Sequence, residues 1–168
     1  IIAGSIDGSR AVREALSAEQ LKSLRGAREK FLISILPSGQ LLIAGSDKRG
    51  TIYGIYEFSE QMGVSPWYYW ADVPVARHES VSVLPGEWSA GEPAVKYRGI
   101  FLNDEWPCLG SWAEDSFGGF NSRFYEKVFE LILRLRGNFL WPAMWNSAFY
   151  DDDPLNGPLA DEMGIVMG

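Results

Sequence analysis

Cysteine and histidine are almost absent from the 168-residue sequence, which contains one of each, Cys108 and His78. A disulfide framework needs at least two cysteines, and a zinc site built from cysteine or histidine needs several such ligands. A Ser-His-Asp arrangement would have to use His78, which sits in the polar run "ARHES", a context typical of a solvated loop. The composition therefore excludes an internal disulfide and a multi-histidine metal site.

Positive charge and long apolar runs are also scarce. Lys and Arg number 15 against 22 Asp and Glu, which gives a net charge of −7. This balance argues against nucleic acid as a partner, because phosphate binding needs clustered Lys and Arg. No apolar stretch approaches the ~20 residues that cross a bilayer, so we expect no membrane span. With 46% hydrophobic and 14% aromatic residues, the composition is that of a folded globular protein.

Both ends of the sequence look interrupted. The chain opens with "IIAGSIDGS", which reads as a strand entering a turn, and it closes with "GIVMG", which reads as another strand. No initiating methionine, signal segment or transit peptide can be read in it. We therefore expect the chain to be a fragment of a longer protein.

The N-terminal half carries signals of both helix and strand. Residues 17–20 form the capping-box pattern S-x-x-Q, which predicts a short helix. Two apolar runs, "FLISIL" and "QLLIA", flank "PSG" and predict two strands joined by a tight turn. Apolar residues recur at helical spacing over residues 52–62, with Gly63 placed as a C-terminal cap. The looser stretch "PGEWSAGEPAV", residues 85–95, predicts a domain boundary.

Beyond this boundary, strand and helix patterns alternate. "YRGIFLN" and "NFLWPAMW" read as strands, and apolar residues stand at helical offsets over residues 124–135 between them. With "LADEM" as a helical turn and "GIVMG" as a third strand, the order is typical of parallel βαβ units. A closed barrel of this kind takes ~250 residues. The sequence thus predicts an α/β fold, in which a small N-terminal α/β domain (1–90) precedes the first βα units of an incomplete (β/α)8 TIM barrel (91–168).

An incomplete parallel sheet leaves a strand edge and one helix face uncovered. We therefore expect exposed apolar patches around Phe129, Leu133 and the "GIVMG" strand.

Polar and aromatic residues follow the first two strands of the second domain. Asn103, Asp104 and Glu105 end the first, and the stretch Trp141–Trp145 ends the second. In a parallel α/β barrel, chemistry gathers at these carboxyl ends. Carbohydrate sites combine carboxylates for proton transfer, amides for hydroxyl groups and indole faces for sugar rings. Alternatively, the acidic groups cap a helix or face solvent, and Trp141 and Trp145 pack in a core.

Strand geometry limits what the two carboxylates can do together. Successive side chains point to opposite faces, so Asp104 and Glu105 can face one ligand only if the strand has already broken, and Pro107 breaks it soon. An inverting glycosidase needs two carboxyl groups ~6.5–9.5 Å apart. We therefore expect a partner from elsewhere, either from residues 151–153 or from sequence beyond this chain.

The loop "GSDKRG" offers two cations, Lys48 and Arg49, between a strand and a helix. Backbone N–H groups and cations in such a loop can surround an anion. The loop matches neither the P-loop nor the G-x-G-x-x-G pattern. We favour the interpretation that its glycines let the helix pack closely on the sheet.

Several long motifs resemble the family 115 glycoside hydrolases, the xylan α-glucuronidases. Residues 43–75, "IAGSDKRGTIYGIYEFSEQMGVSPWYYWADVPV", are similar to the N-terminal domain of that family. "YRGIFLNDEWP", "FGGFNSRFYEKVFELILRLRGNFLWPAMW" and "FYDDDPLNGPLADEMGIVMG" resemble the start of its catalytic barrel, in the same order. The resemblance covers nearly the whole chain and is weakest over residues 1–30.

The resemblance implies removal of glucuronic or 4-O-methylglucuronic acid, linked α-1,2 to xylose, from glucuronoxylan or its oligosaccharides. It implies inversion by a general acid and a general base, with no essential cofactor. Asn103 and Asp104 match active-site positions of the family, Asp104 as a general base or an organiser of the water and Asn103 as a donor to sugar hydroxyls, with Glu105 beside them. Trp145 resembles an aromatic wall of the uronic-acid pocket, with Trp141 as the second candidate.

A uronic acid also needs a cation, for which Lys48 and Arg49 are the candidates if their loop reaches the barrel mouth. The resemblance further suggests a secreted or periplasmic protein, with a homodimer as one candidate state. The remaining acidic residues of the family lie on later strands, so we expect this chain alone to be inactive.

Two other classes compete with the hydrolase hypothesis. One is a non-catalytic carbohydrate-binding module that uses its Trp and Tyr residues. The other is an anion- or nucleotide-binding domain built on "GSDKRG", which the acidic charge and the missing phosphate motif disfavour. Release of glucuronic acid from glucuronoxylan separates the first two classes.

Overall fold

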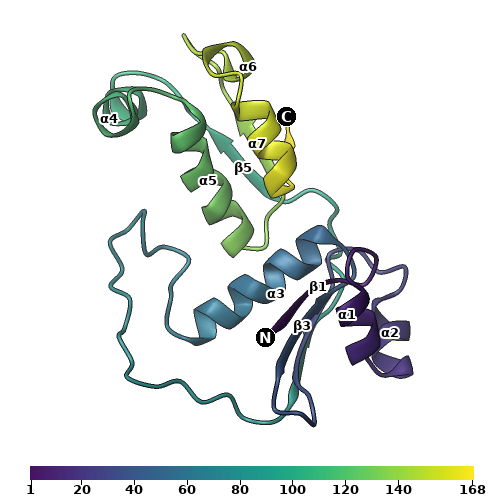
Figure 1. Ribbon diagram of the computed structural model, residues 1–168. Helices are drawn as coiled ribbons and strands as arrows, with labels where there is room; N and C mark the ends of the chain where they lie inside the picture. The colour runs from purple at the N-terminus through teal and green to yellow at the C-terminus, as the bar shows by residue number, and fades with distance from the viewer. The chain divides into compact units, whose positions relative to one another are not determined.

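The computed structural model describes all 168 residues and divides them into two compact units. Unit 1 comprises Ile1–Lys96 and unit 2 comprises Tyr97–Gly168. Each unit combines one β-sheet with α-helices (Figure 1), so the chain is mixed α/β. None of the helices has the length and apolar character that a bilayer-spanning segment requires.

Unit 1 is built on a four-stranded sheet. Its strands stand in the order β1 (Ile2–Ser5), β3 (Leu41–Gly45), β2 (Phe31–Ile35) and β4 (Glu87–Ala90). β2 and β3 form the antiparallel hairpin that the two apolar runs predicted, while β1 pairs with β3 in parallel. The two central strands are almost entirely buried because helices cover both faces of the sheet.

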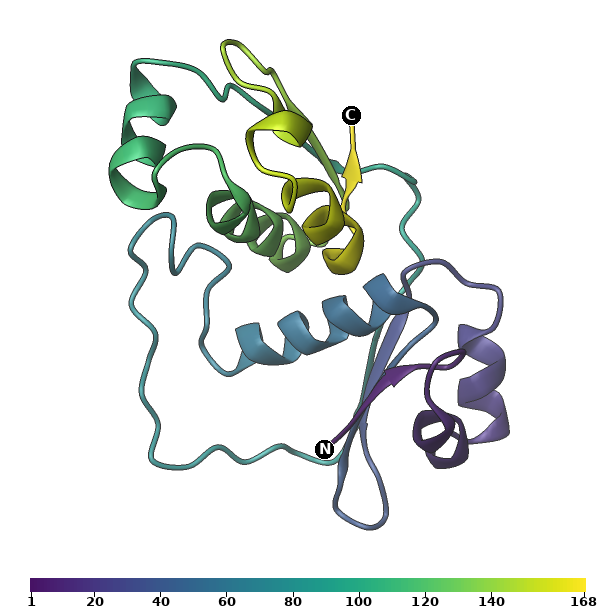
Figure 2. The ribbon, with the colours of Figure 1, turned by 45° about the horizontal axis from the view of Figure 1, so that its top comes forward.

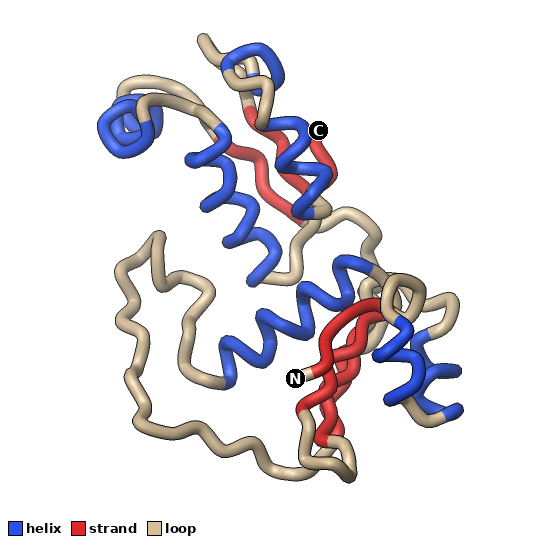
Figure 3. Tube along the Cα trace, viewed as in Figure 1, coloured by secondary structure: helices blue, strands red, loops and turns tan.

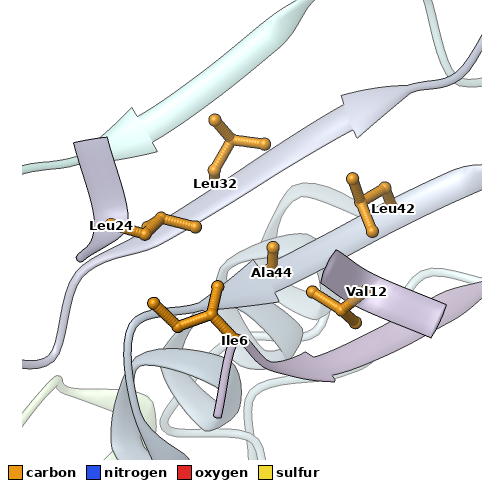
Figure 4. Close-up of a cluster of buried hydrophobic side chains, with 6 residues drawn as sticks. All are labelled: Ile6, Val12, Leu24, Leu32, Leu42 and Ala44. Atoms are coloured by element: carbon orange, nitrogen blue, oxygen red, sulfur yellow. The ribbon is translucent and has the colours of Figure 1, made fainter. Parts of the chain in front are cut away.

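The two faces of this sheet receive different helices. On one face lie α1 (Arg10–Ala15) and α2 (Ala18–Leu24), and the predicted capping box of Ser17 and Gln20 begins α2. Figure 4 shows the core on this side, made of Ile6, Val12, Leu24, Leu32, Leu42 and Ala44. On the other face lies α3 (Lys48–Gln61), which contributes the buried Tyr53.

The segment predicted as a loose linker contains an edge strand. β4 pairs antiparallel with β2, and Arg28 of unit 1 donates a hydrogen bond of 2.8 Å to the carbonyl oxygen of Pro93. These contacts attach residues 87–93 to unit 1. The junction between the units therefore falls between Lys96 and Tyr97, later than the division between residues 90 and 91 that the composition suggested.

Unit 2 is a parallel sheet with helices along it. The strands β5 (Gly99–Leu102), β6 (Phe139–Pro142) and β7 (Val166–Met167) pair in that order, all in parallel. Figure 3 shows these strands in red, with the blue helices beside them. The helices between them are α4 (Cys108–Phe117), α5 (Ser122–Arg134), α6 (Phe149–Asp152) and α7 (Asn156–Met163). α5 and α7 pack against each other beside the strands (Figure 2). The predicted strand–helix–strand order of this half is confirmed.

The apolar face of α5 is covered within unit 2. Phe129 is fully buried and Leu133 is 1% exposed. The ring of Phe149 packs edge to face on that of Tyr125, with 4.7 Å between the ring centroids. The expectation of exposed patches around Phe129 and Leu133 is therefore wrong. α6 and α7, which the sequence indicated only as an acidic turn and a short helical stretch, supply part of this cover.

Candidate functional site at the carboxyl ends of two parallel strands

The carboxyl ends of β5 and β6 lie side by side. Leu102 is paired with Pro142 in the parallel register, and the backbone N–H of Ala143 donates to the carbonyl oxygen of Leu102 at 2.9 Å. The predicted adjacency of these two strand ends is thereby confirmed. Residues 103–105 and 143–147 leave the sheet at the same edge.

Asp104 is fully buried at this edge, and both of its carboxylate oxygens accept hydrogen bonds. Oδ1 accepts the backbone N–H of Met144 at 2.7 Å, and Oδ2 accepts the hydroxyl of Ser147 at 2.7 Å. The hydroxyl of Tyr125, from α5, approaches Oδ2 at 3.4 Å. A buried carboxylate is costly unless such donors surround it, and this one has donors from the turn after β6 and from α5.

Tyr125 stays a hydrogen-bond donor at this site. Burial of its ring, together with the negative charge of Asp104, raises the pKa of Tyr125 far above its ordinary value. Its hydroxyl therefore keeps its proton throughout the physiological range and remains available to Asp104.

The two residues that flank Asp104, just beyond the end of β5, are open to solvent. Asn103 is exposed and Glu105 is partly exposed, and neither side chain forms a hydrogen bond within the chain. The backbone carbonyl of Glu105 accepts the N–H of Gly110 at 2.9 Å, which ties the segment to the first turn of α4. The strand has already ended at Leu102, and the N–H of Asp104 donates to the carbonyl oxygen of Leu102 at 3.0 Å. Asp104 therefore lies inward and Asn103 outward in a turn, to which strand alternation does not apply.

Trp145 is the most exposed aromatic side chain near this edge, at 65%. It lies between Met144 and Asn146, whose φ angles are 57° and 62°, in the left-handed region that non-glycine residues seldom occupy. No glycine marks this turn in the sequence, so nothing in the pattern of residues predicted its conformation.

Trp141 lies within β6 and not at its end. It is 53% exposed, and its ring meets that of Phe101, its partner in the register, edge to face at 5.2 Å. Phe101 is also 53% exposed, whereas Leu140, the neighbour of Trp141 in β6, is fully buried. Both rings are open to solvent in this chain, so residues 1–168 do not enclose either Trp141 or Trp145 in a core.

Lys48 and Arg49 belong to unit 1, where they form the first turn of α3. The guanidinium Nε of Arg49 lies 2.6 Å from Oε1 of Glu29, whose side chain is fully buried. Asp47 caps the helix, with one oxygen accepting from Gly50 N–H at 2.7 Å and the other from Glu29 N–H at 2.8 Å. A Cβ on Gly50 would overlap the carbonyl oxygen of Lys30, so the favoured interpretation of close packing through glycine is confirmed.

The acidic run after β6 serves helix ends. Asp152 accepts the backbone N–H of Ala148 at 2.8 Å, and Asp153 accepts those of Ser122 at 2.8 Å and Leu155 at 2.9 Å. The bonds from these two amides lower the pKa of Asp153 below its ordinary value. No group of three or more His, Cys, Asp and Glu side chains is placed to hold a metal ion.

The strand ends thus combine an amide, a partly exposed carboxylate and an indole in one solvent-facing region, beside a second carboxylate that is internal. Amides and carboxylates can bond sugar hydroxyls, and indole faces can stack on sugar rings. The roles assigned to Asp104, Glu105, Asn103, Trp145, Trp141, Lys48 and Arg49 stay predictions at this point.

A family model matches the second half of this chain, and a solved structure resembles nearly all of it. Residues 90–168 match the family model described as Glycosyl hydrolase family 115. The chain also matches a solved structure described as a novel family GH115 4-O-methyl-alpha-glucuronidase with specificity for decorated arabinogalactans, at 36% identity and a TM-score of 0.87. This match covers 99% of the chain and 23% of that structure, so the chain spans about a quarter of the relative's length. A comparison with curated proteins returned no match. The chain belongs to glycoside hydrolase family 115.

Proposed function

We propose that the full-length gene product carrying this sequence is a glycoside hydrolase that releases glucuronic or 4-O-methylglucuronic acid from a plant polysaccharide. The observation that carries the proposal is the exposed set of Asn103, Glu105 and Trp145 at the adjoining ends of β5 and β6, in a chain of this family. The similarity to a 4-O-methyl-alpha-glucuronidase supports the same product.

Two polysaccharides are candidate substrates. Glucuronoxylan, with the uronic acid linked α-1,2 to xylose, follows from the resemblance of the sequence motifs. Decorated arabinogalactan follows from the specificity described for the matched relative. We propose glucuronoxylan first, because no residue of this chain distinguishes the two backbones and its motifs resemble those of the xylan enzymes.

We propose that unit 2 forms the beginning of a (β/α)8 barrel. Three parallel strands with helices along one side support this, because such barrels place strands inside a ring of helices. In such a barrel the ends of β5 and β6 would border the active-site mouth. The exposed rings of Phe101 and Trp141 would then belong to its interior.

The proposed reaction is an inverting hydrolysis. A general acid protonates the glycosidic oxygen while a general base takes a proton from the attacking water, and the two carboxyl groups stand ~6.5–9.5 Å apart. Glu105 is our candidate for one of these groups, since its side chain is partly open to solvent. Asp152 and Asp153 bond helix ends, so we propose that the second carboxylate comes from outside residues 1–168.

Asn103 and Trp145 are proposed to bind the uronic acid, through the amide and the indole face, with Trp141 as a second aromatic surface. Lys48 is the proposed cation for the uronate carboxylate. Arg49 is proposed for the same role, although it also forms an ion pair with the buried Glu29. The alternative function, a non-catalytic carbohydrate-binding module, would use the same exposed rings.

The deciding experiment incubates the full-length gene product separately with glucuronoxylan and with decorated arabinogalactan. Chromatography and mass spectrometry then detect free uronic acid, and proton NMR reports the anomer released first. We expect release from glucuronoxylan with inversion. Binding to either polysaccharide without any release would favour the carbohydrate-binding module instead.

A further inference from the structure

We propose that Asp104 is a positioning residue: it fixes the turn Met144–Ser147, and through that turn Trp145, and exchanges no proton with substrate. The kinetic part of this proposal rests on the proposed hydrolase function. Its structural part concerns this chain alone and can be tested without any substrate.

Burial argues against direct chemistry at Asp104. A general base must come within hydrogen-bond reach of the proton that it takes, directly or through one water. Asp104 is 0% exposed, and both of its oxygens already accept bonds of 2.7 Å from Met144 and Ser147. Glu105, one residue further, is the carboxylate of this pair that reaches solvent.

The turn that Asp104 holds has an uncommon backbone. Met144 and Asn146 both have φ near 60°, and side chains rarely tolerate that conformation without support from their surroundings. The bond from Met144 N–H to Oδ1 fixes the start of the turn, and the bond from Ser147 to Oδ2 fixes its end. One carboxylate therefore clamps both ends of the segment on which Trp145 stands.

Trp145 has few other constraints in this chain. Its side chain is 65% exposed, and no ring stacking or hydrogen bond holds it to the rest of unit 2. The position of Trp145 is thus set by the backbone of the turn, and the backbone of the turn is held by Asp104. Loss of the clamp should misplace an aromatic wall, and a misplacement of ~1 Å can cost ~100-fold in rate.

The first test compares Asp104→Asn with Asp104→Ala in the full-length gene product. An asparagine keeps all three contacts, because Oδ1 can accept from Met144 while the amide group donates to the oxygens of Ser147 and Tyr125. We expect Asp104→Asn to keep kcat within about tenfold and Asp104→Ala to lose about 100-fold or more. If Asp104→Asn is as inactive as Asp104→Ala, although its turn is intact, Asp104 acts directly and the proposal is overturned.

The second test is a double-mutant cycle with Trp145→Ala. If Asp104 acts through Trp145, Asp104→Ala should lower kcat only a few-fold in a protein that already carries Trp145→Ala. If the fold-losses in kcat of the two single variants multiply in the double variant, the residues act independently and the proposal is contradicted. Full activity of Trp145→Ala would contradict it as well.

The third test measures amide hydrogen exchange over residues 143–148 and needs no turnover. We expect Asp104→Ala to lose protection at Met144 and Asp104→Asn to keep it. Unchanged exchange in Asp104→Ala would show that the clamp does not exist. If the wild-type protein releases no uronic acid, the proposed function fails, and this measurement still decides whether Asp104 holds the turn.

A matched control separates positioning from general destabilisation. Asn138 is 1% exposed, and it joins β5 and β6 at their opposite, amino end by accepting the N–H of Arg98 at 2.9 Å. Asn138→Ala should lower stability in the same way, yet leave kcat of the folded enzyme unchanged. A loss of kcat as large as that of Asp104→Ala would mean that any weakening of this sheet abolishes activity, and would overturn the proposal.

Discussion

Each unit has an aspartate just beyond the end of a strand, Asp47 after β3 and Asp104 after β5. Both carboxylates bond backbone N–H groups, Asp47 those of Gly50 and Glu29 and Asp104 that of Met144. Asp47 caps the helix that follows it and also holds Glu29, 18 residues earlier in the sequence. Asp104 reaches across to the end of a neighbouring strand, with a separation of 40 residues in sequence.

The residues next to the two aspartates differ in whether their side chains are bonded within the chain. In unit 1, Arg49 turns back to pair with the buried Glu29. In unit 2, Asn103 and Glu105 point away from the sheet core and make no side-chain hydrogen bond within the chain. The comparison teaches that polar groups after a strand become a candidate site only where folding leaves them unused. Substitution of Asp47 or Arg49 should therefore lower the free energy of unfolding, whereas substitution of the exposed Asn103 should change it little.

The largest stability effect is expected for Arg49→Ala. Removal of the guanidinium leaves the Glu29 carboxylate buried without its ion-pair partner, which costs about 3 kcal/mol of unfolding free energy. Denaturant unfolding of the full-length gene product measures this loss. The control is Arg10→Ala, which breaks an ion pair with Glu14 whose two side chains are 84% and 62% exposed, and should change stability little. A raised KM for uronic-acid substrates with unchanged stability would instead support Arg49 as the substrate cation.

A smaller loss is expected for Asp47→Ala. This change removes the cap of α3 and the acceptor for the Glu29 N–H, and together these contribute about 2 kcal/mol. Hydrogen exchange in the first turn of α3 should rise in parallel. Asp47→Asn keeps an acceptor oxygen for Gly50 and should recover part of the loss; equal losses in both variants would contradict the capping role.

Asp153 should make the stability of unit 2 depend on pH. Hydrogen bonds from Ser122 and Leu155 lower its pKa in the folded state below the ordinary 3.8. These bonds therefore stabilise the fold above pH 3.8, and their contribution is lost as the pH falls through the lower, folded value. Urea unfolding at a series of pH values should find Asp153→Asn less stable than wild type near neutrality, with the difference shrinking in acid. A difference that stays constant with pH would contradict this assignment.

The smallest stability effect is expected for Asn103→Ala. An exposed side chain without partners contributes within about 0.5 kcal/mol. The same variant should bind the uronic-acid substrate more weakly, which a rise in KM would report. A large loss of stability in Asn103→Ala would break the comparison, because it would make Asn103 a structural residue like Arg49.

Elements with strong local patterns were predictable from the sequence. The capping box of Ser17 and Gln20, the hairpin of β2 and β3, and the long amphipathic α5 all follow from short-range spacing, and all are observed. Asn121 caps α5, accepting the N–H groups of Arg123 and Phe124. After α5, Arg136 takes the left-handed conformation. Gly137 follows it where a side chain would meet Ile132 and the Arg98 carbonyl oxygen.

Elements that depend on small residues or on distant partners were not predictable. α4 packs through Gly110 and Ala113, which carry little hydrophobic signal, so its helical period was missed. β4 lies on the edge of the sheet, and its pairing with β2 has no local signature. In the candidate site, strand alternation applies only to a continuing strand, and β5 ends at Leu102, before Asp104 and Glu105. The burial of Asp104 required knowledge of Ser147 and Tyr125, which no spacing rule connects to it.

The bond between Asp153 and the Ser122 amide spans 31 residues, and this has a consequence during translation. The helix that starts at Ser122 is synthesised before the carboxylate that completes its first turn. At about 5–20 residues per second, the delay lasts on the order of seconds. The nascent helix must rely on Asn121 during that interval, and its final docking awaits the arrival of the acidic run.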